Sequence, residues 1–571
     1  MVFQIIEGSQ VGSYRHEMKN PVEIQILNKR ISAVAEEMGI VLQRSALSAN
    51  IKERRDFSCA VFDGKGRILG QAAHIPVHLG AMPDTITKIR RKFCLKPGEI
   101  VITNDPFAGG THLPDITLIA PVFPAEIEQG VHGDDIRKQL AHENEKQYHD
   151  SVQDPDFYLV VRAHHADVGG KYPGSMSLTR SLEDEGVYIS PGIIGKGWQF
   201  DQDRLLAIVS RMRGPSEREG DLRAQLAALK RGRSRLLSIM EQQDRSTFLD
   251  GITGLLSYGR RFMEATIARI PDGIYRFTDF LDDDGADSEK LPISVTLTVN
   301  GKEVIVDFSE SADQAVTCLN ATRSVTCSAV YYCFFCLVGE GYPVNSGSLE
   351  PVKIITRAGS LLDPLPPAPV AAGNVETSQR IVDALFGALV QAIPSRIPAA
   401  SCGSMNNVAI GGIDDASGEF TYYETIGGGM GARPDSNGLS GVQVHMTNTL
   451  NTPVEALEQI YPFIIERYGL RRGSGGAGKN RGGDGIIRSY RFLKDVSVSL
   501  LTERRRLSPY GLSGGSPGKT GENLLISQGR DALEAQKLLP GKCQFQAAAG
   551  DVLEIRTPGG GGFGSSNPSR P

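Results

Sequence analysis

The sequence predicts an α+β protein with a large mixed β-sheet core, covering helices, and a C-terminal region rich in β-strands and glycine loops. Three observations support this class. Helical periodicity is clear in the first half, short apolar runs bounded by turn residues recur along the chain, and glycine-rich loops gather in the last third. We expect an N-terminal α+β region at residues 1–275 and a β-rich region at 276–571, divided near the acidic stretch FTDFLDDDGADSEK.

The first predicted element is a helix at residues 21–47. Asn20 can cap it, Pro21 suits its first turn, and Glu23 occupies the position of a capping-box acid. One apolar stripe follows helical spacing: Ile24, Leu27, Ile31, Val34, Met38 and Val41.

Short apolar or alternating runs then predict strands. They lie at residues 99–103, 115–123 and 157–165. The stretch at 124–156 is nearly all polar, and we expect a solvated insertion there although it contains His132, His142 and His149. Helical spacing returns at 203–213 and 221–241.

A β-hairpin is predicted at ISVTLTVNGKEVIVDF, residues 293–308. Its Asn300-Gly301 dipeptide, flanked by alternating residues, is the strongest short-range turn signal in the chain. After it, glycine clusters alternate with strand-like runs, which indicates long glycine loops between strands and not a flexible linker.

The glycine loop GSGGAGKN, residues 473–480, resembles a phosphate-binding loop except that Asn480 replaces the hydroxyl residue that would hold Mg²⁺. Such a loop joins a buried strand to a helix. Here YPFIIERYGLRRG (461–473) is expected to end an amphipathic helix, and NRGGDGIIRSYRFL (480–493) to form a strand. We therefore predict a structural loop.

The composition is typical of a soluble globular protein, with 22% charged residues and a net charge of −5 over 571 residues. No basic domain points to nucleic acid, and no leader or long apolar run points to a membrane, so a cytoplasmic location is expected. The eight cysteines lack framework spacing. Cys333 and Cys336 are expected to be buried, reduced thiols on a core helix, with a redox or metal-binding pair as the alternative.

Five of the ten histidines lie in three short segments, AAHIPVH, NDPFAGGTHLPD and RAHHADVGG. His112 and Asp115 belong to a loop, because Pro114 and two glycines exclude a helix there. The predicted strand at 157–165 ends in two adjacent histidines, whose side chains point to opposite faces. Only one of His164 and His165 can therefore share a site with His112 and Asp115.

Two imidazoles and one carboxylate leave coordination positions open, and this set suits Zn²⁺, Mn²⁺ or Fe²⁺. Satisfied core histidines are the alternative interpretation. Asp105, Asp167 and the unused histidine are candidates for orienting the ligands. Asp56 follows three basic residues, and is either an ion-paired acid that holds a turn or a catalytic carboxylate.

Long strings spread from about residue 20 to 565 resemble the hydantoinase B/oxoprolinase family. They include SANIKERRDFSCAVFD, HIPVHLGAM, NDPFAGGTHLPDITLIAPVF, RAHHADVGGKYPGSM, GNVETSQRIVDALFGAL, HMTNTLNTPVEALE, LRRGSGGAGKNRGGDG and LTERRRLSPYGLSGG. The family includes the B subunit of N-methylhydantoinase, the C-terminal half of 5-oxoprolinase, lactam-opening relatives such as caprolactamase, and a subunit of acetone and acetophenone carboxylases. The chief departure is the polar insertion at 124–156, which contains no motif residue.

The resemblance implies that this chain is half of an enzyme, with the other half supplied by a second subunit. A separate hydantoinase A-type subunit with an actin-like fold would bind ATP and Mg²⁺, and the assembly would be a hetero-tetramer or larger. The implied metal ligands are His112, Asp115 and His164, with His165 as the alternative ligand or as an orienting residue.

The reaction that the resemblance implies is ATP-dependent opening of a cyclic amide, such as 5-oxoproline, a hydantoin or a lactam, through a phosphorylated amide. Asp56, Asp105 or Asp167 would be the general base. Two alternatives stay open: a subunit of an ATP-dependent ketone carboxylase, and a non-catalytic scaffold that shapes the active site of the partner.

Overall fold

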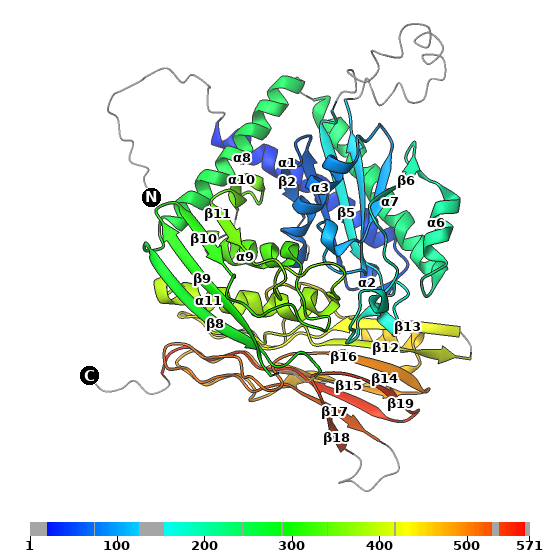
Figure 1. The fold of residues 1–571 in the computed structure, drawn as a ribbon, viewed down its shortest axis with the longest axis vertical. Helices are drawn as coiled ribbons and strands as arrows, with labels where there is room; N and C mark the ends of the chain where they lie inside the picture. The colour runs from blue at the N-terminus through cyan, green and yellow to red at the C-terminus, as the bar shows by residue number, and fades with distance from the viewer. Residues whose placement is uncertain are drawn as a thin grey trace.

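The computed structural model describes residues 20–72, 75–124, 154–242, 244–286, 289–339, 341–415, 418–527 and 536–565. The predicted α+β class is confirmed, with the strands of these residues arranged in four sheets. In Figure 1 the first sheet and its helices form the upper part, and two sheets from the C-terminal third are stacked below them.

The first sheet is antiparallel and carries the candidate site. Its strands, in spatial order, are β2 (Ile68–Gln71), β1 (Phe57–Asp63), β5 (Phe157–His164), β4 (Asp115–Val122), β3 (Ile100–Thr103), β6 (Gly192–Lys196) and β7 (Gln199–Phe200). Successive side chains of β5 point to opposite faces of the sheet. Val161 packs in the hydrophobic core that includes α1 (Pro21–Ser45), and Val160 packs in the core that includes α3 (Ala81–Lys92). Both faces are therefore buried, which explains why the strands are almost entirely apolar.

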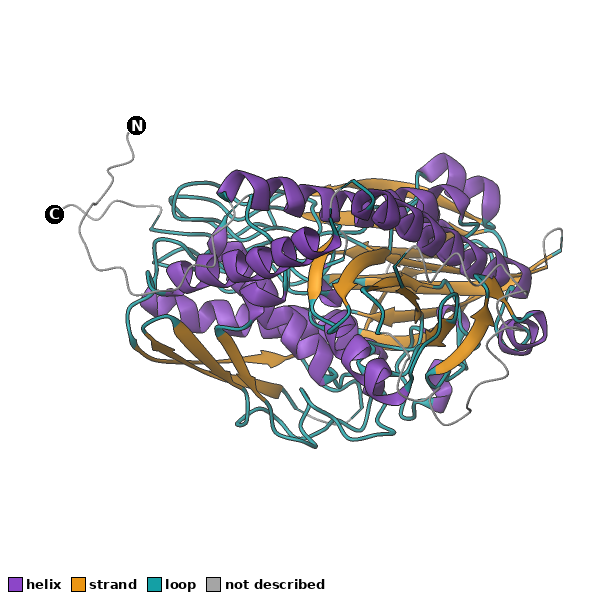
Figure 2. Cartoon of the chain, turned by 90° about the horizontal axis from the view of Figure 1, so that it is seen from above, coloured by secondary structure: helices purple, strands orange, loops and turns teal. Residues whose placement is uncertain are grey.

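Long helices lie side by side over the strands (Figure 2). Helix α1 contacts both α7 (Pro215–Met240) and α8 (Arg245–Ile267), and α7 contacts β4 and β5. The other α-helices among the described residues are α2 (Ala49–Lys52), α6 (Gln202–Val209), α9 (Arg323–Val338), α10 (Ser346–Leu349), α11 (Ser378–Ala392) and α12 (Val454–Ile460). Helix α11 begins directly after a π-helical turn at Gly373–Thr377.

The second sheet packs against α11. Its order is β11 (Val352–Ile355), β10 (Glu303–Asp307), β9 (Leu291–Asn300) and β8 (Gly273–Leu281). Strands β9 and β10 form the predicted hairpin, but Asn300 still pairs with Glu303, so the two central turn residues are Gly301, with a φ of 60°, and Lys302.

The two C-terminal sheets share one hydrophobic core, as in a β-sandwich. One has the order β13 (Gly418–Thr425), β12 (Asn407–Asp414), β16 (Val496–Leu501) and β19 (Lys542–Ala547). The other has the order β14 (Phe463–Arg471), β15 (Gly485–Phe492), β20 (Val552–Arg556), β17 (Glu522–Ile526) and β18 (Gln536–Leu539).

Beside this sandwich, four glycine-rich segments pack backbone against backbone in what we call the glycine layer, residues 426–441, 473–485, 511–518 and 557–564. A Cβ at Gly482 would lie 2.0 Å from the carbonyl oxygen of Gly560, and a Cβ at Gly560 would lie 2.1 Å from that of Met430. Side chains are thus sterically excluded from these contacts, and backbone hydrogen bonds such as Gly560 N–H to Gly483 O hold the layer.

Most elements predicted from periodicity are confirmed. The helix expected at 21–47 is α1, where the side chain of Asn20 accepts a hydrogen bond from the N–H of Val22. The strands at 99–103, 115–123 and 157–165 are β3, β4 and β5, and the helices at 203–213 and 221–241 are α6 and α7. Cys333 and Cys336 lie on α9 as free thiols; Cys333 is buried as predicted, but the predicted burial of Cys336 is wrong, since its side chain is exposed.

The prediction that 461–473 ends a helix is wrong. Helix α12 stops at Ile460, and residues 463–471 form β14, which pairs antiparallel with β15. Cross-strand pairing stabilises this segment more than its weak helical amphipathicity does. The loop 473–480 therefore joins two strands, and Asn480 forms a bridge with Phe563 in the glycine layer. No helix begins after the loop, so it lacks the context of a phosphate-binding loop.

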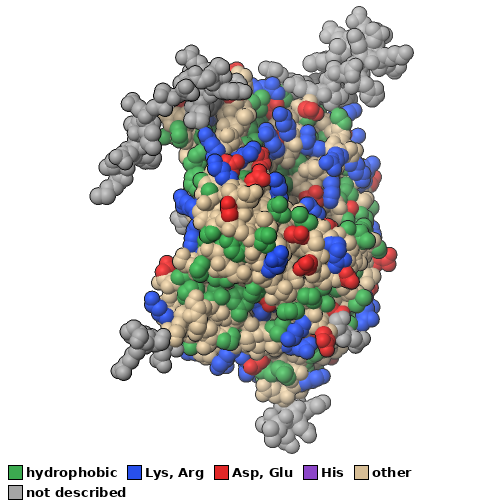
Figure 3. Space-filling model, turned by 60° about the vertical axis from the view of Figure 1, so that its left-hand side comes forward, with side chains coloured by type: hydrophobic (Ala, Val, Ile, Leu, Met, Phe, Trp, Pro, Cys, Tyr) green, Lys and Arg blue, Asp and Glu red, His purple; other side chains and the backbone are tan. Residues whose placement is uncertain are grey.

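Residues 125–153 of the predicted insertion, and His74, lie outside the described residues. The division of the chain at residue 275 stays a prediction, and that residue lies within β8. On the face shown in Figure 3, basic and acidic side chains are interspersed with apolar ones. Among the described helices, none is both long and apolar enough to span a bilayer.

The close backbone contacts of the glycine layer predict how glycine-to-alanine substitutions change the free energy of unfolding. Gly560→Ala should lower the free energy of unfolding by more than about 3 kcal/mol, because its methyl group would overlap the Met430 carbonyl and force the backbone apart. Gly469→Ala is the matched control, since a Cβ there meets no atom within 4 Å, and its stability should change by about 0.5 kcal/mol or less. Chemical denaturation of both variants measures this, and equal stabilities would contradict the steric account.

Candidate metal centre

The site forms where β4 begins and β5 ends. These strands are antiparallel neighbours, and their register places Asp115 directly opposite His164. Side chains of directly opposed residues point to the same face, here the face that α3 covers. The next residue, His165, points to the opposite face and its Nε2 lies 3.1 Å from Gln225 Oε1 on α7.

His112 reaches the same place from the loop before β4. The buried Arg162 ties this loop to the sheet, because its guanidinium donates to the Gly109 carbonyl and to Thr117 Oγ1. Gly109 itself has a φ of 87°, and a Cβ there would lie 2.3 Å from the Thr85 nitrogen. The tight turn therefore needs glycine, and it sets the position of His112.

The three predicted metal ligands converge in the structure. His112 Nε2 lies 3.1 Å from Asp115 Oδ1 and 3.1 Å from His164 Nδ1, and His164 Nδ1 lies 3.3 Å from Asp115 Oδ1. A cation about 2.1 Å from three ligand atoms would hold them roughly 3.0–3.4 Å apart, so the donor set fits a transition-metal ion. A cavity of about 20 Å³ adjoins Asp115 and His164, which is space for one water or exchangeable ligand.

A second set of contacts fixes the Asp115 carboxylate. Its Oδ2 accepts hydrogen bonds from the Thr111 hydroxyl and from His78, whose Nε2 is 3.1 Å away. His78 is held in turn by Ser58 Oγ, 2.8 Å from its Nδ1. Because Oδ2 is fully engaged, Oδ1 is left to face His112 and His164, as an oriented metal ligand requires.

Residues from the second half of the chain close the site. The ring of Tyr423, on β13, stacks on His164 with centroids 4.9 Å apart, and the guanidinium of Arg54 lies over the same tyrosine ring. Asn374, in the π-helical turn, has its Nδ2 3.2 Å from His112 Nε2, while its Oδ1 has no hydrogen-bond partner among the described residues. A half-turn of this amide would present its oxygen to the site, where it suits a cation or an imidazole N–H.

The electrostatics favour an ionised carboxylate. Burial alone would raise the pKa of Asp115, but the nearby His112 and His78 and the hydrogen bonds from His112 and His164 hold it well below its usual range. Burial would lower the pKa of His112, yet the charge and hydrogen bond of Asp115 outweigh burial and raise it. For His164 burial dominates, and its pKa is lowered. The charge of Asp115 thus selects which imidazole retains a proton.

The other predicted site residues lie elsewhere, except for Asp56. Asp56 lines the same small cavity, and its carboxylate is 3.7 Å from the guanidinium of Arg54. Asp105 caps the 3₁₀ turn at Pro106–Ala108 and accepts a hydrogen bond from the Tyr188 hydroxyl. Asp167 accepts from the N–H groups of Gly169 and Gly174 and so organises its own loop.

Sequence reasoning did not assign His78, Thr111, Asn374 or Tyr423 to the site. His78 belongs to one of the three histidine segments and Asn374 to the string GNVETSQR, so both lie within strings that carry the family resemblance. The sequence does not show that these residues lie close together in space, because Asn374 and Tyr423 are more than 200 residues away from His164 in the chain.

A family model described as Hydantoinase B/oxoprolinase matches residues 20–566. The chain belongs to this family. Of its relatives, 5-oxoprolinase 1 of Arabidopsis thaliana is 38% identical over 95% of the chain and 42% of that protein. A protein named as the B subunit of a D-/L-hydantoinase, from Pseudomonas sp. (strain NS671), is 28% identical over 96% of the chain and 90% of that protein.

Solved structures agree with the family assignment. The ATP-dependent caprolactamase from Pseudomonas jessenii has a TM-score of 0.85 and 25% identity, over 96% of this chain and 91% of that one. A nucleotide-free acetone carboxylase has a TM-score of 0.84 over 96% and 76% of the two chains, and its 17% identity shows a shared fold alone. The chain thus spans about two fifths of the 5-oxoprolinase but most of the hydantoinase subunit and of the caprolactamase chain.

The adjacent histidines allow a matched test of the metal centre. His164→Ala should weaken divalent-metal binding by more than about 100-fold, because it removes a ligand, whereas His165→Ala should leave metal content unchanged. Elemental analysis of the two purified variants measures this. Loss of metal only in His165→Ala would show that His165, and not His164, is the ligand. Full retention of metal in both variants would exclude the proposed ligand set.

Metal affinity should also depend on pH. Asp115 raises the pKa of His112 in the metal-free chain, and a protonated imidazole cannot bind a metal. The dissociation constant should therefore rise as the pH falls through this raised pKa, by up to about tenfold per pH unit. Metal titrations at pH 8, 7 and 6 measure this, and a constant affinity over that range would show that His112 is not a ligand.

Proposed function

We propose that this chain is the B-type subunit of an enzyme that uses ATP to open a cyclic amide, with a divalent metal at His112, Asp115 and His164. The observation that carries this is the convergence of the three donor atoms within 3.1–3.3 Å of one another in a family that includes 5-oxoprolinase. The hydantoinase B subunit and the ATP-dependent caprolactamase, whose names specify cyclic amides, support the same reaction.

The proposed division of labour follows from chain lengths. This chain corresponds to 42% of 5-oxoprolinase 1 and to 90% of a hydantoinase B subunit. An A-type partner would supply the remaining functions, namely binding of ATP and Mg²⁺ and phosphoryl transfer to the amide oxygen. The strand–loop–strand geometry of residues 473–480 supports this assignment of ATP to the partner.

The residues of this chain would prepare the hydrolytic step. A metal bound here would polarise the carbonyl oxygen or acidify a water. Asp115 Oδ1 and the two imidazoles would hold that metal, and His78 and Thr111 would keep Asp115 ionised and oriented. Of the three candidate bases, Asp56 is favoured because it alone lines the cavity with Asp115 and His164.

A ketone carboxylase subunit is the second candidate, and the shared fold with acetone carboxylase is the observation that favours it. Its 17% identity carries no information on substrate. A non-catalytic scaffold is the third candidate. Substrate-stimulated turnover, measured in the wild-type complex and in a variant of the metal centre, separates all three.

The test uses this chain purified together with its A-type partner. ADP release and product should be measured with 5-oxoproline, hydantoins, larger lactams and ketones, each with and without bicarbonate. We expect a cyclic amide to stimulate ADP release and to be recovered as the ring-opened acid. Stimulation only by a ketone with bicarbonate would replace the proposal with carboxylation.

Asp115→Asn should reduce ring opening by at least about 100-fold, equivalent to roughly 2.7 kcal/mol, while the complex remains assembled. Asp201→Asn, a change at an exposed helix cap, is the matched control and should keep its rate. Full turnover by Asp115→Asn in an intact complex would favour the scaffold interpretation.

A further inference from the structure

The cavity at the metal centre is too small for a substrate. Its volume of about 20 Å³ is little more than the 10–15 Å³ that one water requires. Binding sites for small organic molecules usually have volumes of hundreds of Å³. A ring that reacts at this centre must therefore occupy an adjoining space.

A cavity of about 720 Å³, which we call the His445 pocket, lies directly beside the metal centre. The two cavities share a wall, since Thr447 lines both. In the same wall, Pro76 faces the larger cavity and His78 the smaller one. Residues of the turn Pro76–His78 and of the segment 444–449 line both cavities.

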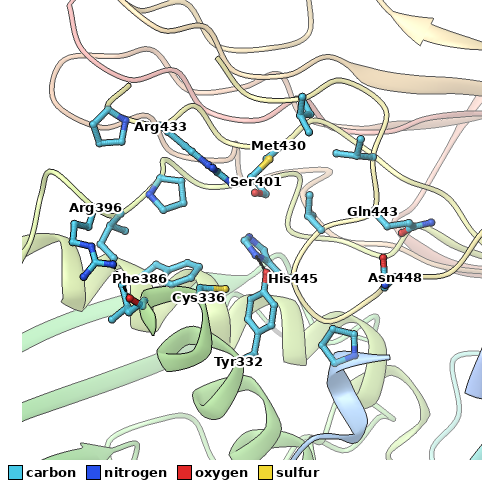
Figure 4. Close-up of a pocket in the computed structure, with 18 of the residues that line it drawn as sticks. Tyr332, Cys336, Phe386, Arg396, Ser401, Met430, Arg433, Gln443, His445 and Asn448 are labelled. Carbon is cyan, nitrogen blue, oxygen red and sulfur yellow. Dashed lines mark hydrogen bonds between the residues drawn. The ribbon is translucent and has the colours of Figure 1, made fainter. Parts of the chain in front are cut away.

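The His445 pocket has a composition suited to a small ring with polar edges (Figure 4). Buried Phe386 and partly buried Met430 supply apolar walls, and the buried side chains of His445 and Ser401 supply polar groups. Arg396 and Arg433 line the exposed part, where they can attract a negatively charged substituent or an activated, anionic form of the ring.

His445 itself has the properties of a functional residue. It is buried, yet its backbone has a φ of 56°, a conformation that non-glycine residues rarely adopt and that is concentrated at active sites. Its Nε2 has no hydrogen-bond partner among the described residues and lies 3.8 Å from Asp383 Oδ1, which also has none. Its Nδ1 lies 3.4 Å from the hydroxyl of Tyr332, which also lines the pocket.

This arrangement resembles an imidazole backed by a carboxylate. Asp383 is on α11 and does not line the pocket, and its other oxygen, Oδ2, accepts a hydrogen bond of 2.7 Å from Arg504. The carboxylate is therefore fixed behind the ring, on the Nε2 side, and Nδ1 faces the tyrosine of the pocket. Such contacts are often too long before substrate binds and shorten in the reacting complex.

We propose that the His445 pocket holds the cyclic amide during ring opening and that His445 is its proton-transferring residue, an inference that rests on the proposed function. In the ring-opening step, a water oxygen bonds to the carbonyl carbon of the phosphorylated amide and the water loses a proton. The C–N bond breaks and the nitrogen gains a proton, and a second water then cleaves the resulting acyl phosphate to the ring-opened acid and inorganic phosphate. The imidazole of His445, in place of Asp56, can take the first proton and return it to the nitrogen, which leaves the histidine unchanged.

The protonation state agrees with this role. Burial lowers the pKa of His445 to about 4, so the imidazole is neutral near pH 7 and can accept a proton. The titratable groups that face it are Asp383 from α11 and Tyr332 from α9. Burial also raises the pKa of Asp383 well above its usual range, against the charge of Arg380, so Asp383 is assigned to orienting the imidazole and not to carrying a counter-charge.

Two substitutions test the proposal in the complex with the A-type partner. His445→Asn keeps a residue that tolerates positive φ, and His445→Gly removes the strain and opens space for added imidazole. Both should lower ring opening by about 100-fold or more, with bound metal unchanged. Imidazole added to His445→Gly should restore at least about a tenth of the rate, and it should not restore Asp115→Asn.

The outcomes separate this proposal from the proposed function. If the wild-type complex opens a cyclic amide with ATP and both His445 variants keep its rate, the proton-transfer role is wrong and the proposed function stands. Loss of activity together with loss of metal, without rescue by imidazole, would assign His445 a structural role and also overturn the proposal. If the wild-type complex opens no cyclic amide, the proposed function fails and this inference fails with it.

Discussion

The site depends on the register between β4 and β5. Asp115 and His164 are direct cross-strand neighbours on the face toward α3, and the same pairing turns His165 toward α7. A slip of one residue in one strand would point its side chains to the opposite face. A slip of β5 would therefore move Arg162 from its hydrogen bond with Thr85 into the apolar core under α1 and α7. Because both faces of this sheet are packed, the hydrophobic core itself enforces the register that assembles the site.

The carboxylate of Asp115 organises the groups that the register brings together. An isolated buried carboxylate is costly, and this one is compensated by three imidazoles and the Thr111 hydroxyl. Its two oxygens have separate roles, since Oδ2 binds Thr111 and His78 and Oδ1 faces the donor atoms of His112 and His164. The network therefore holds the three donor atoms in the orientation that a metal ion requires.

Much of the fold and the core of the site can be predicted from the sequence, because both depend on local patterns. Helical spacing located α1, the Asn300-Gly301 turn located a hairpin, and strand alternation showed that only one of His164 and His165 can face His112. The sequence pattern predicted the wrong element at 461–473, a helix end instead of a strand, because the choice there depends on pairing with the separate strand β15.

The assignments of Asp105 and Asp167 show a different limit. Asp105 precedes a proline and caps the turn after it, and Asp167 binds the N–H groups of two glycines in its own loop. Both are local roles that aspartate often has, and those signals were present in the sequence. Asn374, Tyr423 and His445 could not be found in this way, because only the packing of the C-terminal half onto the first sheet brings them near the metal ligands.

The glycine layer shows that glycine-rich strings in a sequence can result from close backbone packing instead of ligand binding. Its segments touch through bare backbone, so the chain encodes this contact by omitting side chains, and the resulting strings, GSGGAGKN among them, imitate phosphate-binding loops. A glycine pattern required for close backbone packing cannot be told from one that binds an anion by the spacing of its glycines in the sequence. Apart from Asn480, the two differ in the element after the loop, which is a strand here and a helix in a nucleotide site.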